Sequence, residues 1–292
     1  MQQIDLVITD LDNTLYDWFA AWHASFRPML DALVALSGIS EEHLIREIKI
    51  VHERYGTSEY PFVIPELPSL RELHPGVNVS EIYAEALDAY NAGRRTLVLY
   101  DGVRLSLDRL QKAGVLIAGY TESRSYYTHR RLRDLQLDVL LDYVYSPPDH
   151  EFQRSNTGLR TLLPVEPALA RTTHRLLREG EFKPNPAVLL DIIAEVGGRP
   201  ERSLYVGDDL VKDISMANAA GVTAVWARYG SHKDERYELL RRVTHWTRDA
   251  VERQRNADAV HYAPDVTIDS FAELFDHFTF RAHSDARYAA HR

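Results

Sequence analysis

The sequence predicts an α/β protein with a Rossmann-like, doubly wound parallel sheet and an inserted α-helical domain. Short, uniformly apolar runs recur along the chain, and segments with helical periodicity separate them. Strands that are buried on both faces of a parallel sheet have such runs, and parallel strands need helical crossovers. The first two runs, residues 4–8 and 115–120, lie much farther apart than the roughly 30 residues of a simple βαβ unit, so we expect a separate domain between them.

The predicted strands are rich in β-branched and aromatic residues. In chain order they are residues 4–8, 115–120, 143–146, 203–207, 222–226 and 265–268. A doubly wound sheet binds its ligands at the carboxyl ends of its strands. The residues that follow each run are therefore the candidate functional residues.

The inserted domain is predicted to be helical and to cover residues 16–95. Apolar residues recur at helical spacing in three stretches, which begin near Trp18, Leu44 and Ile82. The predicted α/β core is then discontinuous and consists of residues 1–15 and 96–292. Within it, residues 147–182 are expected to form an insertion in which residues 146–167 are irregular, and residues 233–256 are expected to form a long, exposed helix of mixed charge.

Composition excludes several classes of partner and chemistry. The 292-residue chain has a formal net charge of −9 and a pI near 5.8, which argues against binding to nucleic acid polymers or acidic membranes. It contains no cysteine, so disulfides and thiolate metal sites are excluded. The N-terminus lacks the pattern of a secretory signal, and no apolar run approaches the roughly 20 residues needed to span a bilayer. We expect a soluble, cytoplasmic protein.

Polar residues that suit phosphate chemistry follow the predicted strands. They are Asp10, Asp12, Thr14, Thr121, Lys183, Asp208, Asp209 and Asp213. Clustered carboxylates repel one another unless a cation neutralises them. Mg²⁺ binds one or two carboxylates together with substrate phosphate, so the sequence predicts a site for Mg²⁺ and a phosphoryl group.

These residues resemble the four motifs of the haloacid dehalogenase (HAD) superfamily. The motifs are "DLDNT" at residues 10–14, Thr121 after the second strand, Lys183 in "KPNP", and "GDDLVKD" at residues 207–213, and they occur in the family's order. The inserted domain resembles the helical cap of the family's first subclass. The resemblance implies a HAD core and an enzyme that forms an aspartyl phosphate.

The resemblance also implies a role for each carboxylate. Asp10 would be the nucleophile, and Asp12 would protonate the leaving oxygen and then activate water. Mg²⁺ would be held by Asp10, the backbone carbonyl of Asp12 and Asp208, with Asp213 supporting the metal-bound water or Lys183. For Asp209, metal support and a simple turn role both stay open.

The other motif residues would contact the phosphate or the rest of the substrate. Thr121 and Lys183 would stabilise charge on the transferring oxygens, and Thr14 is a candidate substrate-binding residue. In the irregular part of the inserted domain, Arg54, Tyr55, Glu59 and Tyr60 are expected to approach the leaving group. By contrast, we interpret Arg94, Arg95, Arg130, Arg131 and Arg133 as solvated.

Asp12 distinguishes between reactions of the superfamily. A halide leaving group needs no proton, and dehalogenases lack this second Asp. We therefore expect a phosphoric monoester hydrolase that acts on a small phosphorylated metabolite, with a nucleoside monophosphate or a sugar phosphate as candidates. Two alternatives remain, a phosphomutase, which shares Asp12, and a catalytically idle interaction protein.

Overall fold

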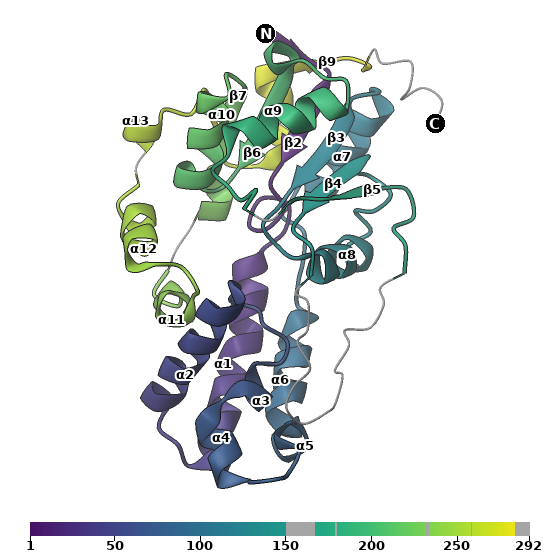
Figure 1. Ribbon diagram of the computed structural model, residues 1–292. Coiled ribbons are helices and arrows are strands. Elements are labelled where there is room, and N and C mark those ends of the chain that lie inside the picture. Colours follow the sequence, from purple (N-terminus) through teal and green to yellow (C-terminus); the bar gives the residue numbers. More distant parts are fainter. Residues whose placement is uncertain (150–166, 179, 232–233, 258, 284–292) are drawn as a thin grey trace. The chain divides into compact units, whose positions relative to one another are not determined.

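The computed structural model describes residues 1–149, 167–178, 180–231, 234–257 and 259–283, and its contacts divide the chain into two units (Figure 1). Unit 1 consists of Met1–Tyr16, Val98–His232 and Ala257–Arg292. Unit 2 consists of Asp17–Leu97 and Lys233–Asn256. The bounds of its first segment are nearly those of the helical domain expected at residues 16–95. Its second segment was expected in the core and belongs to unit 2 instead.

Unit 1 contains a seven-stranded sheet in which all strands run parallel. In sheet order the strands are β5 (Thr173–Leu176), β4 (Tyr143–Ser146), β3 (Leu116–Tyr120), β2 (Leu6–Thr9), β6 (Ser203–Gly207), β7 (Thr223–Ala227) and β8 (Val266–Ile268). Every residue of β2, β3 and β6 is buried, as expected for central strands covered on both faces. The predicted fold class is confirmed.

The first apolar run forms two strands rather than one. β1 (Gln2–Ile4) pairs in parallel with β9 (Phe278–Phe280) in a separate two-stranded sheet, and β2 begins after Asp5. The Asp5 carboxylate is buried, and Arg281 Nη2 donates to it at 3.1 Å. A buried, paired carboxylate thus separates the two strands.

The expected insertion at 147–182 contains a strand, β5, which lies outside the stretch 146–167 that was expected to be irregular. β5 forms the edge of the sheet beside β4, with Tyr143 aligned to Thr173. Three of the four residues in its sequence, THRL, are polar, which suits an edge strand that is only partly covered. Residues 150–166 of the same insertion lie outside the described residues.

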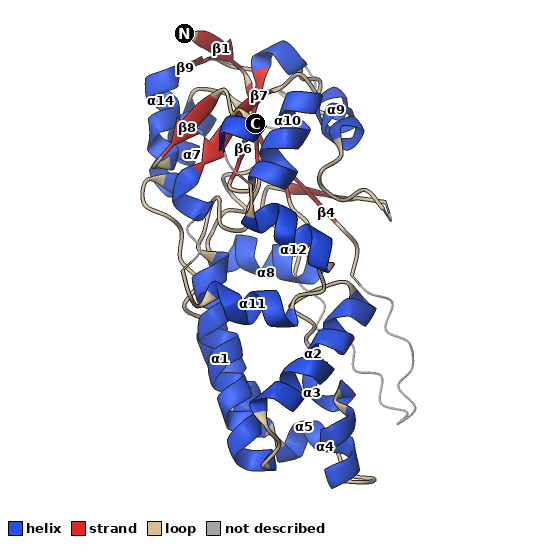
Figure 2. Ribbon diagram, turned by 90° about the vertical axis from the view of Figure 1, so that its left-hand side faces the viewer, coloured by secondary structure: helices blue, strands red, loops and turns tan. Residues whose placement is uncertain are grey.

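Helices cover both faces of the sheet. They are α7 (Val103–Lys112), α8 (Ser125–Asp134), α9 (Pro186–Glu195), α10 (Ser215–Ala219), α13 (Ala259–Tyr262) and α14 (Leu274–His277), with the short helical turns η1 (Pro200–Arg202), η2 (Leu210–Ile214), η3 (Arg228–Ser231) and η4 (Phe271–Glu273). Figure 2 shows α7 and α14 on one side of the sheet and α9 and α10 on the other.

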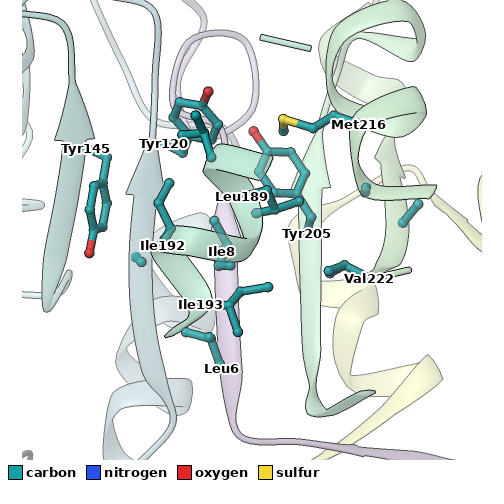
Figure 3. Packing of buried hydrophobic residues seen from close by; sticks show 14 of the residues in the cluster. Leu6, Ile8, Tyr120, Tyr145, Leu189, Ile192, Ile193, Tyr205, Met216 and Val222 are labelled. Atoms are coloured by element: carbon teal, nitrogen blue, oxygen red, sulfur yellow. The ribbon is translucent and has the colours of Figure 1, made fainter. Parts of the chain in front are cut away.

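The apolar core under α9 illustrates why these elements form. Asn185 caps the helix by accepting from the amide of Val188 at 3.3 Å, and Pro186 follows at the first helical position, where a missing N–H costs nothing. Leu189, Ile192 and Ile193 point from α9 onto the sheet, where they pack among Leu6, Ile8 and Tyr205 (Figure 3).

Strand register brings three strand ends together. On β2, Thr9 is aligned with Gly119 of β3 and with Val206 of β6. Asp10, Thr121 and Asp208 therefore leave the sheet beside one another at its carboxyl edge. This is the edge at which doubly wound sheets bind ligands.

Unit 2 is helical. Its helices are α1 (Trp18–Ser37), α2 (Glu41–Tyr55), α3 (Val63–Glu66), α4 (Pro68–Leu73), α5 (Val79–Ile82), α6 (Ala84–Arg94), α11 (Tyr237–Val243) and α12 (Arg248–Arg255). α1 and α6 pack closely because Gly93 has no side chain; a Cβ there would lie 2.2 Å from the Ala24 carbonyl oxygen. None of the described helices of the protein is both long and apolar enough to cross a membrane.

The segment expected to be one long exposed helix is broken and partly buried. α11 packs on α2, and Tyr237, Leu240 and Val243 are buried. The His52 ring of α2 is 1% exposed and its Nδ1 lies 2.7 Å from the Val243 carbonyl oxygen, which helps to end α11 at that residue. The prediction failed because the many charges of this segment concealed a short apolar face.

Candidate active site

Asp10 is placed by the end of β2 and by the tight turn that follows. Its amide donates to the Val206 carbonyl at 2.8 Å, which fixes it against β6. The turn is held by hydrogen bonds from the amides of Thr14 and Leu15 to the Leu11 carbonyl, and the Thr14 hydroxyl donates to Asp10 Oδ2 at 3.1 Å. The Asp10 carboxylate is therefore fixed with 7% of the residue exposed.

A buried ammonium lies between two carboxylates. Lys183 Nζ is 2.5 Å from Asp10 Oδ1 and 3.0 Å from Asp213 Oδ1, and the Lys183 side chain is 3% exposed. Lys183 precedes α9, while Asp213 lies in η2, just after β6. The site thus joins residues from three distant parts of the sequence in one ion-pair cluster.

The pKa values of this cluster reflect burial and excess negative charge. Burial raises the pKa of the Asp10 carboxyl from 3.8 to about 8; Lys183 acts to lower it, and Asp213 and Asp12 raise it further. Burial likewise raises the pKa of Asp213, against the effect of Lys183. For Lys183, burial acts to lower the pKa, but the two carboxylates outweigh it and hold the ammonium charged. One ammonium does not neutralise the cluster.

Two tyrosines that the sequence analysis did not identify surround Lys183. Its Nζ lies 5.1 Å from the ring centroid of Tyr120 and 5.5 Å from that of Tyr205. The Tyr205 hydroxyl also donates to Asp213 Oδ1 at 3.0 Å. Both tyrosines belong to predicted strands, β3 and β6, so their burial was predictable but their contact with Lys183 was not.

Asp12 is held by three side chains. Its Oδ2 accepts from the hydroxyls of Thr121 at 2.9 Å and Ser123 at 2.8 Å. Its Oδ1 accepts from Arg131 Nη1 at 2.9 Å. The interpretation of Arg131 as solvated is wrong, because this residue is only 8% exposed. Arg131 follows the buried Tyr127 and Thr128 by four and three residues, a helical spacing that places it on the inner face of α8.

The end of β7 supports both acidic loops. Trp226 Nε1 donates to the Asp208 carbonyl at 3.0 Å, and the Tyr229 hydroxyl donates to the Thr14 carbonyl at 2.7 Å. Gly230 lies close to both acidic loops: a Cβ added there would be 1.7 Å from the Asn13 carbonyl oxygen and 3.1 Å from Asp208 Cβ. The sequence analysis assigned no role to these residues, because they belong to none of the four motifs.

The acidic cluster offers oxygen ligands of the kind that a hard divalent cation binds. One carboxylate oxygen each from Asp10, Asp208 and Asp213 lie within 4.8 Å of one another. Asp213 already accepts from Lys183, the Tyr205 hydroxyl and the Asp209 amide. Oxygen ligands with excess negative charge suit Mg²⁺, so the residues present fit the expected ion.

Asp209 has a structural role in the described site. Its Oδ1 accepts from the amides of Val211 at 2.9 Å and Lys212 at 3.1 Å, so it caps η2. This turn carries Asp213. Of the two roles left open for Asp209, the hydrogen bonds favour that of a turn residue.

The four candidate residues of the helical domain lie in unit 2 and interact with one another or with their neighbours. Tyr55 and Tyr60 stack with ring centroids 3.7 Å apart. Arg54 forms an exposed ion pair with Glu66 at 3.3 Å, and the Glu59 amide donates to Thr57. Their approach to a leaving group stays a prediction.

Comparison with known families agrees with this site. Residues 4–221 match the family described as haloacid dehalogenase-like hydrolase, and residues 182–274 match a second family, described as HAD-hydrolase-like. The chain belongs to the haloacid dehalogenase-like hydrolases. The predicted superfamily is confirmed.

Similar proteins of this HAD family include phosphatases. A glyceraldehyde 3-phosphate phosphatase of Methanopyrus kandleri is 26% identical over 276 residues, which cover 94% of this chain and 96% of the relative. A phospholysine phosphohistidine inorganic pyrophosphate phosphatase of Homo sapiens is 24% identical over 238 residues, which cover 78% of this chain and 84% of the relative. The expected enzyme class, a phosphoric monoester hydrolase, is confirmed at this level.

Solved structures show the same fold. A 2-haloacid dehalogenase from Pseudomonas syringae pv. Tomato DC3000 superposes with a TM-score of 0.55 at 18% identity, covering 94% of this chain and 97% of the other. A HAD phosphatase from Thermococcus onnurineus superposes with a TM-score of 0.51 at 18% identity, covering 94% and 97%. Dehalogenases and phosphatases thus share this fold, and the site residues must decide between their reactions.

Proposed function

We propose that this protein is a Mg²⁺-dependent phosphatase that hydrolyses a small phosphate monoester through an aspartyl phosphate on Asp10. The observation that carries the proposal is that two neighbouring carboxylates have different partners. Asp10 contacts an ammonium, whereas Asp12 contacts two hydroxyls and a guanidinium. Two carboxylates in different surroundings suit one nucleophile and one acid–base group.

The chain's own residues would perform two successive displacements. An Asp10 oxygen forms a bond to phosphorus while the bond from phosphorus to the ester oxygen breaks, and that oxygen leaves with a proton from Asp12. Asp12, now ionised, takes a proton from water, whose oxygen bonds to phosphorus as the bond to Asp10 breaks. Inorganic phosphate leaves, and both carboxyl groups return to their starting states.

The remaining polar groups would stabilise charge. Lys183, whose ammonium is fixed by Asp10 and Asp213, would face the transferring oxygens together with Thr121. Asp10, Asp208 and the backbone carbonyl of Asp12 would hold Mg²⁺, and the bound ion would neutralise charge shared by the carboxylates and the phosphate. Asp213 would orient Lys183, since both of its oxygens already accept hydrogen bonds.

Asp12 supports a phosphatase over a dehalogenase. A departing alkoxide needs a proton, whereas a halide does not, and the three donors that hold the Asp12 carboxylate support this role. One relative is named for glyceraldehyde 3-phosphate, and the other for phospholysine, phosphohistidine and inorganic pyrophosphate. The first of these names supports a small phosphorylated metabolite here. A nucleoside monophosphate and a sugar phosphate are the candidate substrates.

Asp10→Asn tests the reaction. Purified protein with Mg²⁺ should release phosphate from a panel of sugar phosphates, nucleoside monophosphates, glyceraldehyde 3-phosphate and pyrophosphate, and Asp10→Asn should abolish this release. Asp276→Asn, which neutralises an exposed carboxylate of unit 1, is the matched control and should keep full activity. Retained turnover in Asp10→Asn would exclude this nucleophile, dependence on an added bisphosphate would indicate a mutase, and no release from any compound would favour an idle protein.

A further inference from the structure

Arg131 contacts Asp12 but has no role in the mechanism above. Its side chain is 10% exposed, and Nη1 donates to both Asp12 Oδ1 and Ser123 Oγ at 2.9 Å. Its neighbour Arg130 is different, since its side chain is 35% exposed and pairs with Asp134 at 3.6 Å on the surface. Burying a guanidinium costs free energy unless its contacts are made, so the inward position of Arg131 calls for an explanation.

We propose that Arg131 is a positioning residue that fixes the Asp12 carboxyl group for proton transfer to the leaving oxygen. This inference rests on the proposed function. It adds a residue outside the four motifs and predicts how the effect of that residue depends on the leaving group.

The two carboxylate oxygens of Asp12 have different hydrogen-bond partners. A guanidinium can only donate, so Oδ1 is held as an acceptor by Arg131. The hydroxyls of Thr121 and Ser123 face Oδ2, and a hydroxyl can turn to accept as well as donate. Oδ2 is thus the oxygen whose surroundings tolerate a proton, and Arg131 fixes the plane of the carboxyl group.

The helix that carries Arg131 is itself anchored. The Thr128 hydroxyl donates to the Ser123 carbonyl at 2.9 Å, and the Tyr126 amide donates to Asp149 Oδ1 at 2.8 Å. Thr128 is completely buried. The Thr128 contact ties α8 to the loop that supplies Ser123, and the Tyr126 contact ties α8 to the segment that follows β4, so the helix holds Arg131 in place beside Ser123.

The consequence concerns the leaving group. When an alkyl phosphate is cleaved, the departing alkoxide must gain a proton as its bond to phosphorus breaks, and Asp12 supplies it. A 4-nitrophenolate departs without a proton. Loss of the Asp12 orientation should therefore slow alkyl phosphates far more than 4-nitrophenyl phosphate, whereas general damage to the fold slows both equally.

Arg131→Gln tests the proposal with two substrates. We expect kcat/KM for the best alkyl phosphate of the panel to fall by about 10²-fold, the usual size of a general-acid contribution, and that for 4-nitrophenyl phosphate to fall by less than about fivefold. Arg131→Lys, which keeps the positive charge, should recover part of the difference. Arg130→Gln removes the same charge from the surface of the same helix and should change neither rate.

Other results would overturn the proposal. Equal losses on both substrates would assign Arg131 a structural role, and a raised KM with unchanged kcat would assign it to substrate binding. Crystal structures of the wild type and Arg131→Gln give a readout without turnover: an Asp12 carboxyl group that keeps its orientation in the variant contradicts positioning, and a rotated one supports it. If the wild type hydrolyses no ester, the proposed function fails while this structural comparison still decides the role of Arg131.

Discussion

Gly230→Ala should damage the site by displacing a loop rather than by removing a reactive group. Gly230 does not have a positive φ, so alanine can adopt its backbone conformation and the cost is one of space. The added Cβ would lie 1.7 Å from the Asn13 carbonyl oxygen, whereas such contacts essentially never fall below 3.0 Å. The distance between this Cβ and the Asn13 oxygen must therefore grow from 1.7 Å to at least 3.0 Å, so one of the two loops must move by 1.3 Å or more. Asn13 follows Asp12 directly, and the same Cβ would lie 3.1 Å from Asp208 Cβ.

The expected result is a loss of turnover with a retained fold. A misplacement of about 1 Å in a catalytic group costs on the order of 10²-fold in rate, so kcat with 4-nitrophenyl phosphate should fall by about that factor. Because Asp208 is affected too, half-maximal activation should need more Mg²⁺. Gly198→Ala is the control, since its Cβ would meet Leu6 and Ile193, away from the acidic loops. Turnover and Mg²⁺ activation equal to those of the wild type would refute the reasoning.

Two further predictions concern buried charges. Lys183→Met should lower kcat by about 10²- to 10³-fold. It should also lower the free energy of unfolding in urea by about 3–5 kcal/mol, because Asp10 and Asp213 lose their shared cation. Turnover within about tenfold of the wild type would contradict this prediction. Burial lowers the pKa of His52 to about 4, against 6.5 for a free imidazole, so its contribution to stability is complete above pH 6.5 and is lost as the pH falls towards 4. Urea unfolding at about pH 7 and about pH 5 should then differ by about 2 kcal/mol more in the wild type than in His52→Gln, and an equal pH dependence would show that His52 is not responsible.

The central sheet and the grouping of the acidic residues could be predicted because both depend on local signals. A strand buried on both faces has a uniformly apolar run, and parallel strands place their carboxyl ends at one edge. Asp10, Thr121 and Asp208, each of which follows a predicted strand, were therefore expected together from the sequence alone. Their catalytic roles stay predictions until turnover is measured.

The remaining features depend on contacts that local sequence does not encode. β5 is an edge strand in which three of four residues are polar, and Arg131 lies in a run of charged residues. Both segments therefore resemble exposed sequence until their neighbours in the fold are known. The prediction for the segment that contains α11 was wrong for the same reason: only the packing of α11 against α2 identifies Leu240 and Val243 as core residues. The spacing of Arg131 from the buried Tyr127 and Thr128 was the one signal that could have been used.

Both units contain elements from widely separated parts of the chain, and this affects how the protein folds. β1 pairs with β9, and α2 packs against α11, so each unit needs residues that are synthesised late. Contacts with such large sequence separation slow folding, because a long loop must close before they form. During translation, the part of α2 that α11 covers remains exposed until Tyr237–Val243 has left the ribosome. The nascent chain therefore exposes apolar surface for most of its synthesis, and truncation before this segment should yield an aggregation-prone helical unit.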